Sequence, residues 1–348
     1  MSLSVLTPHE TLAQLAKPEL KAVRHYVLSP DDWLVVCGGF EDRALGVLEN
    51  AVATQTPFHV LLIRYEPHLA QNKADAIYAI CAQAGVSVQE AVYNLQSPAG
   101  FGDTLTTMLS VCCGNIFLDV SGMSRLLIVQ ALVALAARPG SFANCFVTYA
   151  QATCYPPSHD EAEDELARSE SDQSYSILFL SSGVFEVTVV SELSSLAMAG
   201  EQTRLVAFPS LDAHHLIALL AELQPSRFSF IEGVPPSPEN HWRQKVIAAL
   251  NRLDQFVASE RYATSTLRYQ ETLDRLLDIY SRHALRELLM IAPTGSKMQA
   301  VAVGIFRSFV HDVQIVHPTP RGFLDPGNYT RGVGQLHLLP LGPLAALE

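Results

Sequence analysis

Trp33-Leu-Val-Val-Cys37, followed by Gly38-Gly39, is the clearest indication of the fold class in this sequence. Its five apolar residues show no polar alternation, which is typical of a parallel strand buried on both faces. The paired glycines then predict a tight turn into a helix over about 41–53. A buried parallel strand that leads into a helix is the repeating unit of α/β folds.

The same strand and helix alternation recurs through the chain and predicts two tandem Rossmann-like units with mostly parallel sheets and flanking helices. A helical arm to about residue 28 precedes the first unit. Its further strands are expected at 58–64, 87–93, 116–120 and 145–149, with helices at 69–84, 104–113 and 123–137. The second unit has expected strands at 204–208, 228–231, 264–267, 288–292, 313–317 and 335–339, with helices at 211–223, 239–258, 269–283 and 297–310.

An acid-rich segment separates the two series. Residues 159–174 read HDEAEDELARSESDQS, with seven acids against the single Arg168, and predict a connector or surface insertion. Residues 177–180 and 184–190 then predict a β-hairpin. The expected division is therefore a first unit with its helical arm at 1–158, a connector with the hairpin at 159–200, and a second unit at 201–348. First strands begin near 33 and 203 and fourth strands near 115 and 287, so we interpret the units as diverged copies.

Composition narrows the class of protein. The chain has 348 residues, 49% hydrophobic and 17% charged, which fits two well-packed domains and excludes a disordered chain. Its formal net charge of −12 disfavours a long nucleic acid as the main ligand. The N-terminus lacks an apolar secretory core, and the most apolar stretch, 126–137, is too short to cross a bilayer and predicts a buried helix. Six cysteines without a CxxC pair favour reduced thiols. We expect a cytoplasmic protein with no membrane contact.

Ligands of open parallel sheets bind outside the carboxyl ends of the strands. The first such loop is Gly38-Gly39-Phe40-Glu41-Asp42-Arg43. Its glycines permit close backbone approach to a ligand, and Glu41 and Asp42 are candidate acids or bases. The alternative is structural, because acids stabilise a helix N-terminus and Arg43 can pair with one of them.

The loop after the fourth strand is Asp119-Val-Ser121-Gly122-Met-Ser-Arg125. Ser121 and the amides that follow it can donate to an anion, and Arg125 would add a fork of donors for phosphate. Asp119 can orient Arg125, accept from a ribose hydroxyl or act as an acid or base. The alternative is a capped turn with a solvated arginine.

The corresponding loop of the second unit is Thr294-Gly295-Ser296-Lys297. Lys297 would act as a point charge, and Thr294 or Ser296 as a helix cap or ligand donor. It is not a Walker loop, because an upstream glycine is missing and Met298 follows the lysine. An ordinary capped turn with a solvated lysine is the alternative here.

Two further loops are expected near the same edge. In the loop over 232–243, Trp242 can stack on a base and Arg243 can meet a phosphate, although such a tryptophan also suits a core position. In the loop over 321–332, Tyr329 belongs to a glycine-rich segment that is either a lid or a surface loop. No zinc spacing, HExxH, GxSxG or GxGxxG is present, so we expect neither a metal nor a cofactor.

With Asp119, Ser121 and Arg125 in this spacing, the chain resembles the CARF domains (CRISPR-associated Rossmann fold) of prokaryotic antiviral systems, whose fourth-strand motif is Asp/Asn-x-Ser/Thr-x-x-x-Arg/Lys. The second unit's Thr294-Gly295-Ser296-Lys297 is similar to the family's Thr-Gly-Gly-Thr-Lys variant, but is one residue shorter and lacks the Asp or Asn. The resemblance implies binding of a cyclic oligonucleotide second messenger across a two-fold axis between two such domains. Here both domains would belong to one chain, as an internal pseudo-dimer.

Three functions follow as hypotheses. The first is a nucleotide-binding sensor in an antiviral defence system that signals to a separate effector protein, since the nuclease or DNA-binding domain typical of the family is missing. The second is a nucleotide-processing hydrolase, a glycosidase or phosphodiesterase, that uses Glu41, Asp42 or Asp119. The third is a scaffold subunit of a defence complex. A small nucleotide is the expected ligand in the first two, and a homodimer is left open.

Overall fold

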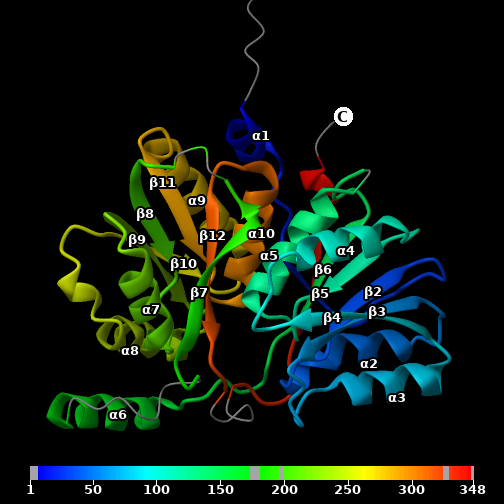
Figure 1. The fold of residues 1–348 in the computed structure, drawn as a ribbon. Helices are drawn as coiled ribbons and strands as arrows, with labels where there is room; N and C mark the ends of the chain where they lie inside the picture. Colours follow the sequence, from blue (N-terminus) through cyan, green and yellow to red (C-terminus); the bar gives the residue numbers. More distant parts are fainter. Residues whose placement is uncertain are drawn as a thin grey trace, which may run out of the picture.

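The computed structural model describes residues 7–138, 140–172, 181–195, 197, 199–323 and 329–345. They form two sheets flanked by helices, set side by side in Figure 1. The strands of the first sheet, in spatial order, are β1 (Lys21–Val23), β13 (Leu336–Pro340), β6 (Cys145–Ala150), β5 (Ile116–Asp119), β2 (Trp33–Cys37), β3 (His59–Glu66) and β4 (Ser87–Asn94). Those of the second are β10 (Glu260–Ser265), β9 (Arg227–Val234), β8 (Gln202–Ala207), β11 (Glu287–Ala292), β12 (Gln314–Pro320) and β7 (Val184–Ser194).

The predicted α/β class is confirmed. Strands β2–β6 of the first unit and β8–β12 of the second are parallel, and each set has the spatial order third, second, first, fourth, fifth. The helices of the first unit are α1 (Pro8–Gln14), α2 (Gly46–Val52), α3 (Ala74–Ala84), α4 (Phe101–Ser110), α5 (Arg125–Ala136) and α6 (His159–Asp172). Those of the second are α7 (Ala213–Leu223), α8 (Trp242–Leu250), α9 (Tyr269–His283) and α10 (Lys297–Phe309).

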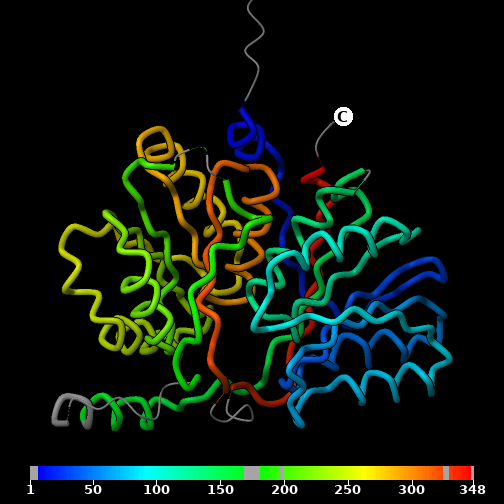
Figure 2. Tube along the Cα trace, in the orientation of Figure 1, coloured from blue at the N-terminus to red at the C-terminus, as the bar shows by residue number. Residues whose placement is uncertain are grey.

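The two units exchange their sixth strands. Strand β7 follows the first unit in sequence but pairs antiparallel with β12 of the second, while β13, near the chain end, pairs antiparallel with β6 of the first. The crossing of the chain after β12 can be followed in Figure 2. The predicted boundaries at 159–200 and 201–348 therefore do not coincide with the sheets, because apolar runs predict strands but not their neighbours.

Helices α5 and α10 pack against each other between the two sheets (Figure 1). Most of α5 is fully buried, as predicted for the apolar stretch 126–137. Gly304 permits the close contact, since a Cβ there would lie 2.6 Å from Leu132 Cδ1. One hydrophobic core consequently includes residues of both units, and the N-termini of the two helices lie at the same end of the molecule. Of the helices that the structure describes, none has the length and apolarity needed to cross a bilayer.

Some predicted elements differ from those observed. The N-terminal arm is helical only in α1 and then contributes β1. The helix expected at 239–258 is interrupted after α8, where Arg252 adopts a left-handed conformation with φ +49°. Residues 159–172 of the acid-rich segment form helix α6, which packs its Ala162 and Leu166 near α8. The expected strand at 177–180 lies outside the described residues.

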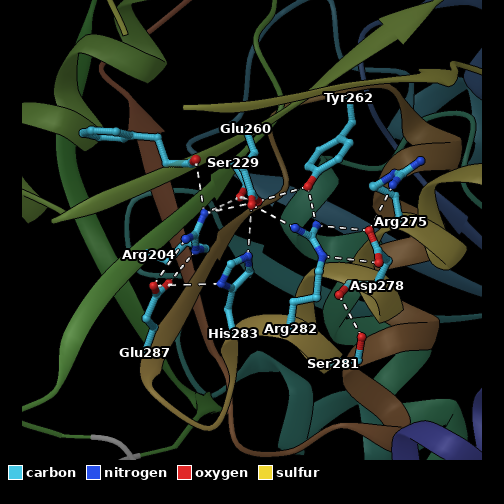
Figure 3. A network of polar contacts seen from close by, with 11 residues as sticks. Arg204, Ser229, Glu260, Tyr262, Arg275, Asp278, Ser281, Arg282, His283 and Glu287 are labelled. Atoms are coloured by element: carbon cyan, nitrogen blue, oxygen red, sulfur yellow. Dashed lines mark hydrogen bonds and ion pairs between the residues drawn. The ribbon is translucent and has the colours of Figure 1, made fainter. Parts of the chain in front are cut away.

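A polar network joins the amino ends of four strands in the second sheet (Figure 3). Arg204 on β8 is 5% exposed and pairs with Glu287 on β11 at 2.5 Å and Glu260 on β10 at 3.2 Å. It also donates to Ser229 Oγ on β9 at 3.0 Å, and His283 on α9 contacts Glu260 at 3.1 Å. These contacts tie the sheet together at the edge opposite the carboxyl ends of its strands.

Candidate functional site

A cavity of about 630 Å³ lies between the two units, at the carboxyl ends of both sets of parallel strands. Its volume falls within the usual range for small-molecule sites. Of its charged lining residues, four are cations and two are carboxylates: Arg43, Arg125, Arg243, Lys297, Glu41 and Glu239. The cavity thus favours an anion although the chain as a whole is acidic.

The floor of the cavity is formed where the loops after β2 and β5 cross. A Cβ on Gly39 would lie 2.5 Å from the Gly122 carbonyl oxygen, and a Cβ on Gly122 would lie 2.4 Å from the Cys37 carbonyl oxygen. Only glycine at both positions permits this backbone approach. The close approach that these glycines permit is between the two loops themselves, whereas the sequence predicted an approach of Gly39 to a ligand; both residues also line the cavity.

Reciprocal hydrogen bonds join the fourth-strand loops of the two units. Arg125, the first residue of α5, donates from Nε to the carbonyl oxygen of Gly295 at 2.6 Å. Lys297, the first residue of α10, donates from Nζ to the carbonyl oxygen of Met123 at 2.8 Å. Each cation thus contacts the residue two positions before the other. Ser124 and Ser296 cap the two helices, so the N-termini of α5 and α10 face one cavity.

The helix starts define how the two loops correspond. Counted from Arg125 and Lys297, Thr294 corresponds to Gly122 and Gly295 to Met123. Thr294 lines the cavity, but its hydroxyl donates to the Phe208 carbonyl oxygen at 2.8 Å. Gly295 contributes the carbonyl that Arg125 contacts, and Ser296 is the cap of α10.

Asp119 and Ser121 do not reach the cavity, contrary to the prediction. Both side chains are fully buried, and Asp119 Oδ1 accepts from the Ser121 amide at 2.9 Å and from its hydroxyl at 2.5 Å. The Ser121 hydroxyl in turn accepts from the Ala150 amide at 2.8 Å, which ties β5 to β6. The two residues shape the loop that presents Arg125, and neither side chain lines the cavity.

Glu41 pairs with two of the cations that line the cavity, Arg43 and Lys297. Its carboxylate is 2.6 Å from Arg43 Nη2 and 3.3 Å from Lys297 Nζ, and it accepts from the Thr330 hydroxyl at 2.6 Å. Burial opposes ionisation of Glu41, but Lys297 and Arg43 outweigh burial and hold its pKa at about 2. Burial lowers the pKa of Lys297 to about 8 against the opposing effect of Glu41, so the lysine is still mostly protonated at pH 7.

Aromatic side chains cover the cavity on the side of the first unit. Phe40 makes edge contacts with Phe323 and Tyr329 at centroid distances of 5.2 and 5.1 Å. The Arg43 guanidinium donates to the Tyr149 hydroxyl at 2.9 Å and lies over the Tyr149 ring. Such faces are suited to stacking on a nucleobase. From the described part of the segment over 321–332, Phe323, Tyr329 and Thr330 line the cavity.

Several other predicted residues have structural roles. Trp242 stacks on His159 of α6 at 4.8 Å and does not line the cavity, so its predicted base contact is wrong. Arg243 lines the cavity, but its guanidinium donates to the carbonyl oxygens of residues 155–157. Asp42 lies outside the lining, where it accepts from the Gly332 amide at 3.1 Å and pairs with Lys73. Gly38 packs against Ala74 at the start of α3.

The cavity also contains residues that the sequence reasoning missed. Tyr65 accepts from the Ser124 amide at 2.5 Å and so fixes the start of α5, and His215 and His317 form part of the wall of the second unit. His317 is the last residue of the strand expected at 313–317, a position that could have signalled its role. His215 lies one turn into a helix, where no sequence pattern marks it. Within the described ranges, no group of three or more His, Cys, Asp or Glu residues is placed to hold a metal ion.

The dependence of the unfolding free energy on pH tests the burial of the Asp119 carboxyl. Burial raises its pKa to about 7, and its Oδ2 has no hydrogen-bond partner. The unfolded value is about 3.9, so the folded state loses stability as pH rises from about 4 through 7. Asp119→Asn keeps the Oδ1 acceptor and removes the charge. We expect the advantage of Asp119→Asn over wild type in unfolding free energy to grow by about 2 kcal/mol between pH 5 and pH 8.

Urea unfolding at both pH values measures this difference. If the difference in unfolding free energy between Asp119→Asn and wild type is the same at pH 5 and pH 8, the pKa of Asp119 is not raised in the folded protein.

Comparisons with known proteins assign neither a family nor a function to this chain. No family model matches the chain, and no curated protein matches it in sequence. Similar solved structures include the cytoplasmic domain of a prokaryotic cation chloride cotransporter (10% identity, 83% of this chain and 95% of that chain, TM-score 0.24) and an isoflavone reductase (10%, 82% and 91%, TM-score 0.23). A third is phosphoethanolamine N-methyltransferase 1 of Haemonchus contortus (9%, 81% and 73%, TM-score 0.22). Likenesses this low carry no information about what this chain binds.

Proposed function

We propose that this protein is a sensor that binds a cyclic oligonucleotide or a related nucleotide second messenger in the cavity between its two units. The observation that carries the proposal is the position of Arg125. Its Nε contacts Gly295, and among the described residues its two terminal nitrogens have no hydrogen-bond partner, although the side chain lines the cavity. An arginine fork with unused donors is suited to a phosphate.

The surroundings of Arg125 support the same ligand class. The N-termini of α5 and α10 face the cavity and favour negative charge through their dipoles and free amides. Lys297 adds a second cation from the other unit. Aromatic rings beside these groups provide faces for bases. The antiviral setting and a separate effector rest on the family resemblance and belong to the proposal on that basis.

The geometry favours binding over hydrolysis. Asp119 is buried away from the cavity, and Asp42 lies outside its lining. Glu41 does line it, but a pKa held at about 2 makes this carboxylate a poor general base and leaves no proton for acid catalysis at neutral pH. None of the three candidate acids is therefore placed and tuned for the nucleotide-processing hydrolase considered above.

Thermal unfolding of the full chain with a panel of ligands tests the proposal. The panel contains cyclic di-, tri- and tetranucleotides. AMP is the control for the cyclic backbone, and inorganic phosphate is the control for the base. We expect one ring at 100 times its dissociation constant to stabilise the protein by about 2.7 kcal/mol, a shift of several degrees in melting temperature. The controls at the same concentration should give a much smaller shift. A panel in which no ring shifts the transition would overturn the proposal.

A further inference from the structure

The wall of the cavity that belongs to the second unit differs in chemistry from that of the first. His215 on α7 and His317 on β12 both line it. Both ring nitrogens of His215 and the Nδ1 of His317 are buried without a hydrogen-bond partner. Buried polar groups are nearly always hydrogen-bonded in folded proteins, and an exception calls for an explanation. A bound molecule that supplies the missing partners is such an explanation.

Both imidazoles are uncharged at neutral pH. Burial lowers the pKa of His215 to about 4 and that of His317 to about 3, and the nearby Arg125 acts in the same direction. Asp212 lies 3.8 Å from His215 Nε2, but its carboxylate already accepts from the Ser181 hydroxyl and the His214 amide. A neutral imidazole offers one donor and one acceptor, which suits an uncharged partner better than a phosphate.

The loops after the first strands show why the two walls differ. In the first unit this loop carries Glu41 and Arg43, whereas in the second unit Leu211 is the residue from this loop in the lining, and no cation accompanies it. Proline rings at 235, 236, 318 and 320 add apolar surface to the same lining. The pseudo-symmetry of the floor is thus not repeated in the walls. Around His215 and His317 the second wall combines apolar surface with uncharged hydrogen-bonding groups, and its charged residues, Glu239 and Arg243, come from the loop over 232–243.

We propose that His215 and His317 form a base-recognition subsite, which reads the hydrogen-bonding edge of one nucleobase of the bound messenger while Arg125 and Lys297 hold its phosphates. This inference rests on the proposed function. It assigns the specificity for the base to the second unit. Because the wall of the first unit lacks matching imidazoles, the two halves of a symmetric ring would be bound differently.

Titration calorimetry with base-matched rings tests the subsite. For the ring size that binds, we compare the adenine, guanine, cytosine and uracil forms, which carry the same charge. Wild type should prefer one base by at least about tenfold. The double variant His215→Phe/His317→Phe, which keeps the ring shape but not its nitrogens, should bind all four forms within about threefold of one another. His215→Gln/His317→Gln, which keeps a donor and an acceptor at each position, should retain part of the preference.

The outcomes separate this inference from the proposed function. If no cyclic nucleotide binds wild type, the proposed function fails. If rings bind but wild type shows no preference, or if the Phe double variant keeps the wild-type preference, the subsite is wrong and the sensor assignment stands. Equal melting temperatures of the variants and wild type show that the fold is intact, and the Gln variant provides a second reading if the Phe variant is unstable.

Discussion

Lys297→Met is expected to weaken binding of the cyclic oligonucleotide about 100-fold, which corresponds to about 2.7 kcal/mol. The substitution keeps the length of the side chain but removes the cation that the second unit contributes to the phosphate-binding floor. It also leaves Glu41 with Arg43 as its remaining cation, so the cavity becomes more negative. Titration calorimetry at fixed salt measures the loss, since phosphate binding depends strongly on ionic strength.

Lys21→Met is the matched control for this substitution. Lys21 is exposed on β1 and does not line the cavity. Lys21→Met therefore changes the net charge by the same amount as Lys297→Met, but should leave the dissociation constant within about twofold of the wild-type value. Equal affinities of Lys297→Met and wild type would contradict the assigned role of Lys297. If Lys297→Met also kept the protein's cellular function, the scaffold hypothesis would be favoured instead.

Arg204→Met is expected to lower the unfolding free energy by about 3 kcal/mol. The guanidinium is nearly buried and pairs with both Glu260 and Glu287, so its removal leaves the largely buried Glu287 without an arginine partner, while Glu260 keeps Arg282 and His283 (Figure 3). Hydrogen bonds to Ser229 and to the Phe228 carbonyl oxygen are lost as well. Urea unfolding monitored by far-UV circular dichroism measures the change.

Arg268→Met provides the comparison within the same unit. Arg268 pairs with Glu271 three residues away, but its side chain is 73% exposed, and exposed pairs contribute little. We expect a loss of under about 1 kcal/mol. Equal losses for the two variants would show that burial of the Arg204 network adds nothing to stability.

Much of the fold was predictable because local hydrophobic patterns determine it. Buried runs such as Trp33–Cys37 and the mostly apolar α5 identify parallel strands and a central helix without any information about partners. The exchange of β7 and β13 was not predictable, since neither strand carries a sequence signal for the sheet that it joins: β7 is an 11-residue strand with few buried residues, and β13 is a five-residue strand. The sheet that each strand joins depends on contacts between residues far apart in the chain, such as Val316 with Val189 and Leu338 with Thr148.

The candidate site was predictable in position and less so in detail. The topological rule places Glu41, Arg125 and Lys297 at one edge, and the structure brings them to one cavity. The rule does not predict which way a side chain points. In the structure Ser121 faces the interior and Trp242 packs on α6. It also gives no signal for His215, whose importance depends on the loss of hydrogen-bond partners in the folded protein.

The stoichiometry of binding tests most directly whether the two units form one site. Titration calorimetry of the full chain with the ring that shifts its melting temperature should give one ligand per chain, and Arg125→Leu and Lys297→Met should each weaken that single event. Two independent ligands per chain, or binding that responds to a substitution in only one unit, would contradict the account of a shared cavity.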